Sequence, residues 1–169
     1  MMTRSPIWKY SLGIKFLCVI GILLSAYSLY VKYRLARDSD YEALCDLSDR
    51  IKCTKVFHSR YGNGFGIIGE MLGGDESIFN QPNGINGIIF YTLIILLDFS
   101  LNLHLTKLQV ALSFISNLIS IYLAYLLYFV FENLCIVCAT LYVVNMLLLI
   151  LSVKRYSNLV KNVDSRKNK

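Results

Sequence analysis

Charged residues are scarce in this chain: they make up 17% of its 169 residues, against 56% hydrophobic ones. A compact water-soluble domain of this size could not hide so much apolar surface, so a membrane protein is predicted. Histidine is nearly absent, and neither His58 nor His104 has a CxxC or HxxxH neighbour, which disfavours a zinc site. No repeat of about 20 to 50 residues occurs, which excludes a repeat architecture.

Four apolar stretches are each long enough for a membrane-spanning helix, which needs about 17 to 25 residues. We therefore predict an all-α membrane protein, a bundle of four transmembrane helices forming a single domain over residues 1–153. A lid of loops and short helices is expected within residues 38–83, and a disordered basic tail over 154–169. Lys15 and Asp98 lie one turn from a stretch end, so both are expected to reach the membrane surface. The stretches are Tyr10 to Val31, Gly84 to Leu101, Leu108 to Phe131 and Leu134 to Val153.

The net charge of +6 reflects membrane topology rather than binding of nucleic acid, because the basic residues flank the apolar stretches. The amino terminus, the second connection and the tail carry ten of the 17 lysines and arginines, which favours both termini in the cytosol. The lid then lies on the opposite face of the lipid bilayer. In a eukaryote this face is the lumen of the endoplasmic reticulum, where disulfides persist.

A CxxC motif opens the fourth apolar stretch, in the segment ENLCIVCATLYVVN. With Asn133 as helix N-cap, Cys135 and Cys138 have Cβ atoms about 5 to 6 Å apart, close enough for a disulfide. A helix amino terminus also favours thiolate, so a reactive dithiol at the lumenal membrane edge is predicted. Tyr142 lies on the same helical face at a depth where polar groups are usually functional. Asn145 is predicted to join helices by hydrogen bonds.

A second cysteine pair lies in the lid. On an unbroken helix the Cα atoms of Cys45 and Cys53 would be about 12 Å apart, whereas a disulfide needs less than about 7 Å. Either the helix breaks before Cys53, or Cys53 bonds elsewhere part of the time, with Cys135 as its second partner. The second possibility leads to a relay of exchanging disulfides. Cys18, alone in the first stretch, is predicted to be a small buried apolar residue.

Less specific explanations exist for the same motifs. The four cysteines outside the first stretch could form two purely structural disulfides in a four-helix membrane scaffold. The segment GFGIIG, residues 64–69, matches a dinucleotide-binding fingerprint, but no strand precedes it and no βαβ unit fits between two spans. The glycines at 62, 64, 66, 69, 73 and 74 are interleaved with apolar residues, which instead predicts a compact lid that excludes water from a site beneath it.

Four motifs together resemble a known family: RDSDYEALCDLSDRIKCTKVFHSRYGNGFG, SIFNQPN, IFYTL and CIVCATLY. They are similar to those of the vitamin K epoxide reductases, and the likeness runs through all four apolar stretches. The resemblance implies a four-helix enzyme of the endoplasmic reticulum membrane that reduces vitamin K 2,3-epoxide to the quinone and on to the hydroquinone. It implies no metal and no loosely bound cofactor. The implied electron donor is a thioredoxin-like lumenal oxidoreductase, and coumarin-type anticoagulants are candidate ligands.

The resemblance also implies roles for single residues. Cys135 and Cys138 would form the active-site dithiol, with Cys138 nearest the substrate. Cys45 and Cys53 would pass electrons inward, Cys53 by exchange with Cys135. Asn83 and Tyr142 would hydrogen-bond the two quinone oxygens. An apolar pocket for the substrate would be lined by Val56, Phe57, Phe90 and Leu123. Ser59 would help hold the lid.

The chain departs from the family pattern at two positions: Tyr61 stands where tryptophan is usual, and Asn86 stands where an aromatic residue is usual. The final residues, RKNK, resemble a dibasic endoplasmic reticulum retrieval signal, which requires a cytosolic carboxyl terminus. The same four cysteines would also serve a quinone-reducing oxidase that makes disulfides for lumenal proteins. That enzyme is the alternative function.

Overall fold

The computed structural model describes residues 5–38, 40–48, 51–66, 80–130 and 133–167 of the chain. Across these ranges the fold is all-helical, as predicted, and the residues pair only in isolated bridges, Ser48 with Ile51 and Asn63 with Pro82. The elements are α1 (Ser5–Arg37), α2 (Cys53–His58), the 3-10 turns η1 (Arg60–Gly62) and η2 (Gly64–Gly66), α4 (Asn83–Asp98), α5 (Leu103–Phe129) and α6 (Ile136–Lys167).

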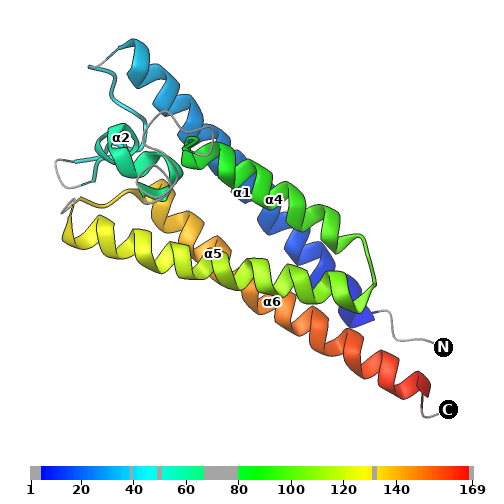
Figure 1. The fold of residues 1–169 in the computed structure, drawn as a ribbon. Helices are drawn as coiled ribbons and strands as arrows, with labels where there is room; N and C mark the ends of the chain where they lie inside the picture. Colours follow the sequence, from blue (N-terminus) through cyan, green and yellow to red (C-terminus); the bar gives the residue numbers. More distant parts are fainter. Residues whose placement is uncertain (1–4, 39, 49–50, 67–79, 131–132, 168–169) are drawn as a thin grey trace.

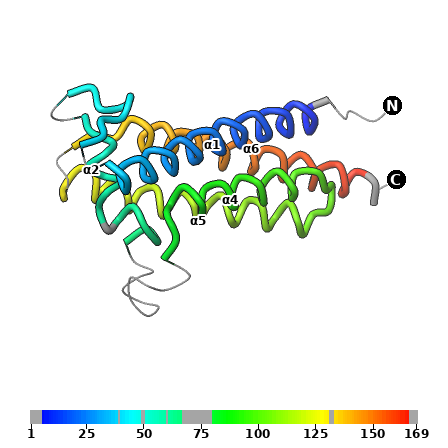
Figure 2. Tube along the Cα trace, turned by 90° about the horizontal axis from the view of Figure 1, so that it is seen from above, coloured from blue at the N-terminus to red at the C-terminus, as the bar shows by residue number. Residues whose placement is uncertain are grey.

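The four long helices form one elongated bundle in which α1 contacts α4 and α6, and α5 contacts α6 and α4 (Figure 1). The lid elements α2, η1 and η2 lie at one end of this bundle, and both chain termini lie at the other (Figures 1 and 2). A bundle with its two ends on one side is what an even number of membrane passages produces. The predicted lid glycines Gly69, Gly73 and Gly74 lie outside the described residues.

Three helices, α1, α5 and α6, are long and apolar enough to cross a membrane, which confirms three of the four predicted spans by length and composition. Large apolar side chains cover their outer surfaces: Phe16, Leu23 and Tyr128, for example, are well exposed, as expected for lipid-facing positions. The fourth, α4, has 16 residues and falls short of that length. The fourth transmembrane passage therefore stays a prediction.

The carboxyl end of α4 carries a buried charge, so the prediction that Asp98 reaches the membrane surface is wrong. Its carboxylate is fully buried, lies 3.2 Å from Nε of Arg155 and 3.7 Å from Nζ of Lys15, and accepts a hydrogen bond from the hydroxyl of Ser11. Two cations replace the water that the carboxylate would otherwise need. Arg155 is 1% exposed and also donates to Thr106 and Gln109 on α5. This charge cluster joins all four long helices.

The predicted disordered tail is helical in the structure, because α6 continues without a break to Lys167. Arg155 is held in the charge cluster one turn beyond Leu151, and Leu159 is buried a turn further on. These anchors lie after the apolar stretch, so the helix extends well past Val153. The last two residues of the RKNK signal, Asn168 and Lys169, lie outside the described residues.

Removing the anion of the charge cluster should destabilise the bundle strongly. Asp98→Ala leaves the Arg155 guanidinium buried without its counter-charge, and breaking a buried pair in this way typically costs about 3 to 5 kcal/mol. Thermal unfolding in detergent measures the loss, with Asp164→Ala, an exposed carboxylate on α6, as the control. Equal melting temperatures for the two variants would show that the cluster contributes nothing to stability.

Candidate active site

A cavity of about 450 Å³ lies among the four long helices and beneath the lid. Ser28 of α1, Phe90 of α4, Leu123 of α5 and Tyr142 of α6 stand in its wall, and the lid contributes Phe57. Most of the wall is apolar, which suits a hydrophobic ligand that arrives from the membrane. Of the residues expected to contact substrate, the structure places six in this wall: Val56, Phe57, Asn83, Phe90, Leu123 and Tyr142.

Ser59 lies in the lid, outside the cavity wall as the structure defines it. Its hydroxyl donates to the carbonyl of Val56 at 2.7 Å, and its own carbonyl accepts from the N–H of Gly62 at 3.0 Å. These bonds close the carboxyl end of α2 and join it to η1. Ser59 therefore shapes the lid segment that carries Val56 and Phe57.

The CxxC cysteines lie at the boundary between the lid and α6. Helix α6 begins at Ile136, so its N-cap is Cys135. The prediction from the sequence that Asn133 is the N-cap is wrong. The Cys135 carbonyl accepts from the N–H of Ala139, and its sulfur accepts from the N–H of Cys138 at 3.3 Å. The two cysteines are free thiols whose sulfur atoms lie 2.7 Å apart. Cys138 stands in the cavity wall.

Cys135 is the more acidic thiol of the active-site pair for a local reason. The contact with the Cys138 sulfur holds the pKa of the Cys135 thiol below its ordinary value, although burial opposes this effect. The N–H groups of Cys138 and Val137 act in the same direction as the sulfur contact. A lowered pKa increases the fraction of thiolate, which is the form that attacks a disulfide.

The second cysteine pair is joined. Cys45 and Cys53 form a disulfide with Cα atoms 5.9 Å apart, because the described residues between them, 46–48 and 51–52, are not helical. Of the two possibilities left open by the sequence, the structure shows the break: α2 begins only at Cys53. Cys45 is 8% exposed, whereas Cys53 and Cys135 are completely buried.

Asp46 is a site residue that sequence analysis missed. Its carboxylate accepts hydrogen bonds from the N–H of Cys53 at 2.6 Å, of Thr54 at 3.2 Å and of Ala43 at 3.1 Å. Burial alone would raise the pKa of Asp46, but a hydrogen bond from the Thr54 side chain and the three N–H groups together hold it below its ordinary value. One carboxylate therefore caps α2 and folds the Cys45 loop back onto it. The sequence feature that could have indicated this role is an acidic residue directly after Cys45 and seven residues before the start of α2.

Asp46 and the two disulfide sulfur atoms also have the close spacing of a metal site, within 4.8 Å of one another. The sulfur atoms of Cys45 and Cys53 are bonded to each other, however, and thiolates are what a metal would need. The Asp46 oxygens already accept three N–H groups. In this oxidation state the three residues do not fit a metal ion.

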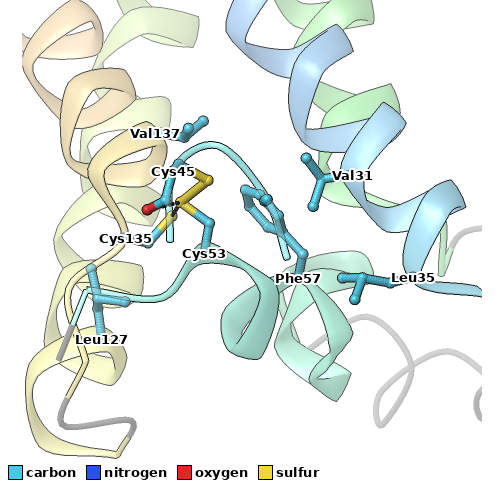
Figure 3. Close-up of a cluster of buried hydrophobic side chains, with 9 residues drawn as sticks. Val31, Leu35, Cys45, Cys53, Phe57, Leu127, Cys135 and Val137 are labelled. Atoms are coloured by element: carbon cyan, nitrogen blue, oxygen red, sulfur yellow. Dashed lines mark hydrogen bonds between the residues drawn. A yellow bond between two sulfur atoms is a disulfide. The ribbon is translucent and has the colours of Figure 1, made fainter. Parts of the chain in front are cut away.

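The two cysteine pairs are in contact. The Cys135 sulfur lies 3.6 Å from the Cys53 sulfur, within an apolar cluster that includes Val31, Phe57 and Val137 (Figure 3). Three sulfur atoms from the lid and the start of α6 thus gather at one point. Thiol–disulfide exchange between Cys53 and Cys135 needs no larger movement than closing a van der Waals contact.

Asn83 is the first residue of α4, and its side chain connects this helix to the lid. Its amide donates to the carbonyl of Tyr61 at 2.7 Å and accepts from the N–H of Phe65 at 2.9 Å. Phe65 has φ of 57°, a left-handed conformation that is unfavourable for a residue with a side chain, and Gly64 and Gly66 share it. The GFG sequence is therefore a left-handed turn held by Asn83.

The helices around the cavity are also joined by amides. Asn145 of α6 accepts from the hydroxyl of Tyr91 at 2.8 Å and donates to the hydroxyl of Ser120 at 2.9 Å. The backbone carbonyl of Asn145 accepts from the side-chain amide of Asn117 at 2.9 Å. The predicted helix-joining role of Asn145 is confirmed. The prediction for Cys18 is confirmed as well, since it is fully buried in an apolar cluster of α1, α4 and α6.

Comparison with known proteins agrees with this arrangement. The profile of the Vitamin K epoxide reductase family matches residues 12–153. The chain is 46% identical over 139 residues to vitamin K epoxide reductase complex subunit 1 of Mus musculus, covering 82% of this chain and 86% of that protein. It is 45% identical over the same length to the protein of that name from Rattus norvegicus, with equal coverage. The chain belongs to the vitamin K epoxide reductase family.

Proposed function

We propose that this protein is a vitamin K epoxide reductase, which reduces vitamin K 2,3-epoxide to the quinone and the quinone to the hydroquinone. The observation that carries the proposal is the position of Cys138, a free thiol in the wall of an apolar cavity and in contact with a second thiol. Membership of the family gives the substrate class. An apolar naphthoquinone with an isoprenoid tail suits a cavity walled by Phe57, Phe90 and Leu123.

The dithiol supplies both electrons of epoxide reduction. In this mechanism the Cys138 sulfur attacks an epoxide carbon, the carbon–oxygen bond breaks, and the thiol proton of Cys138 passes to the oxygen. Cys135 thiolate then attacks the Cys138 sulfur, which forms the disulfide, releases the carbon with its electron pair and expels the hydroxyl group as water. The balance is one epoxide and two thiols giving one quinone, one disulfide and one water. A second dithiol cycle adds two electrons and two protons to give the hydroquinone.

The outer pair regenerates the dithiol. Reduced Cys53 attacks the sulfur of Cys135 in the inner disulfide, and Cys45 then displaces Cys135 from the mixed disulfide, which leaves the outer pair oxidised. The oxidation state in the structure, with Cys45 bonded to Cys53 and two free thiols inside, is the product of this transfer. A thioredoxin-like lumenal oxidoreductase would reduce the outer pair through Cys45, its more exposed sulfur.

Two polar side chains would bind the substrate oxygens. Tyr142 stands one turn beyond Cys138 in the cavity wall, and Asn83 stands across the cavity on α4. An amide nitrogen carries two N–H groups, and the bond to Tyr61 uses one of them. Val56, Phe57, Phe90 and Leu123 would hold the ring and the tail, with Ser59 supporting the lid. Coumarin-type anticoagulants are candidate ligands of the same cavity.

We propose that the protein lies in the endoplasmic reticulum membrane with the lid in the lumen and both termini in the cytosol. The oxidising lumen preserves the outer disulfide, and the basic carboxyl-terminal part of α6 suits the cytosolic side. The coincidence of both termini at the end opposite the lid supports this orientation (Figure 2).

The activity test is turnover of vitamin K 2,3-epoxide by membranes that contain this chain, with dithiothreitol as reductant. Quinone formation that depends on the protein supports the proposal. Reduction of quinone without any reduction of epoxide would contradict it and would favour the alternative, an oxidase that passes electrons from lumenal proteins to quinone.

Tyr142→Phe should lower the turnover by about a hundredfold or more, because loss of one donor to an oxygen that gains charge typically costs about 2.7 to 4 kcal/mol. The ring and its packing remain, so the melting temperature should stay close to that of the parent protein. Tyr125→Phe, which removes an exposed hydroxyl from α5, is the control. An unchanged rate with a lowered melting temperature would show that Tyr142 only joins helices. Asn83 is less suitable for this test, because its replacement also releases the lid.

A further inference from the structure

A second amide on α4 has no hydrogen-bond partner for its nitrogen. Asn86 stands in the cavity wall, and its side-chain nitrogen is buried without an acceptor among the described residues. Leaving a buried N–H unpaired costs about 1 to 3 kcal/mol. Such an atom calls for an acceptor that the protein alone does not supply, and the cavity is the space where a ligand would bring one.

The position of Asn86 relative to Asn83 indicates where that acceptor lies. The two residues are three apart on α4, so their Cβ atoms are about 5 to 6 Å apart on one helical face. Both stand in the cavity wall. Two amides at this spacing can converge on a single oxygen atom between them.

Close packing against α1 fixes the rotation of α4 about its own axis, so that the face with Asn83 and Asn86 is directed to the cavity. A Cβ atom at Gly84 would lie 2.7 Å from the carbonyl oxygen of Ser25 on α1, so only glycine permits the contact. With Gly84 directed to α1, the helix cannot turn Asn83 and Asn86 away from the cavity. The terminal torsion of an asparagine is soft, so the Asn86 amide can turn its N–H toward a ligand within this fixed frame.

We propose that Asn86 is a substrate-binding residue whose N–H donates to the same quinone oxygen as Asn83, so that this oxygen has two donors. The inference rests on the proposed function and adds a residue to it. A carbonyl oxygen has two lone pairs and accepts two hydrogen bonds. As electrons enter the ring, negative charge develops on the oxygen, and two fixed amide donors stabilise it more than one.

Asn86→Leu tests the proposal because it keeps the branched shape and the number of side-chain heavy atoms and removes the amide. With wild-type protein as reference, kcat/KM for vitamin K quinone and its epoxide should fall by about a hundredfold. Loss of the unpaired buried N–H should leave the melting temperature of the ligand-free protein equal or higher. Ile85→Leu, a neighbouring change on α4 outside the cavity wall, should leave both quantities unchanged.

A kcat/KM within threefold of wild type, counted per folded molecule, would overturn the assignment of Asn86. If Asn86→Leu does not fold, Asn86→Ala carries the same comparison, because it removes the amide and adds no bulk. Failure of the proposed function is a different result: wild-type protein itself would then not reduce the epoxide.

Discussion

Cys138→Ala should abolish reduction of vitamin K 2,3-epoxide, with the rate falling to the level of membranes that lack the protein. The thiol in the cavity wall is the group that attacks the substrate, and no other described cysteine stands in that wall. Supplying more dithiothreitol should not restore turnover, because a reductant regenerates a dithiol and cannot replace a missing nucleophile. Product analysis by chromatography of the quinone and epoxide measures the effect.

Cys135→Ala should abolish steady turnover as well, since the adduct on Cys138 would lack the neighbouring thiol that displaces it. The bound substrate would fill the cavity and so keep a small thiol from reaching the Cys138 sulfur. The matched control is Cys18→Ala, which removes a fully buried thiol of α1 and should retain activity. Retained epoxide reduction in Cys138→Ala would disprove the dithiol mechanism.

Cys45→Ala should separate the two routes by which electrons reach the active site. With a thioredoxin-like protein as donor, turnover should stop, because Cys45 is the more accessible end of the outer disulfide and a protein cannot reach Cys53 or Cys135, which are completely buried. With a small membrane-permeable thiol, turnover should persist at a comparable rate. Such a thiol can enter the cavity and reduce the inner pair at Cys138.

Cys53→Ala is the matched variant, and it should show the same dependence on the donor. Equal loss of activity with both donors would show instead that the Cys45–Cys53 disulfide serves only to hold the lid. Measuring the melting temperature of each variant detects that structural role directly, since loss of a structural disulfide typically costs about 2 to 5 kcal/mol.

The positions of the helices were predictable because runs of apolar residues are a local signal. Length and hydropathy locate α1, α5 and α6 within a few residues of their cores. The helix ends were missed where distant contacts decide them. Arg155 extends α6 because it meets Asp98, which lies 57 residues earlier, and no local pattern shows that pairing.

In the candidate site, too, local features were predictable from the sequence and features that depend on distant contacts were not. Spacing indicated a dithiol at Cys135 and Cys138, and motif resemblance named six further residues that line the cavity. Spacing could not decide between a broken helix and an exchanging pair for Cys45 and Cys53, because the answer depends on the Asp46 hydrogen bonds. The unpaired nitrogen of Asn86 is likewise visible only once the packing around α4 is known.

The shortness of α4 has a consequence for how the chain is inserted during translation. Its 16 residues span about 24 Å, less than the hydrocarbon core of about 30 Å, and it ends in an acidic residue, Asp98. When α4 leaves the ribosome, Lys15 has already been made, but Arg155 has not. The α4 segment should therefore remain loosely held beside the translocon until α6 arrives, so a chain that stops after α5 would be a substrate for quality-control degradation.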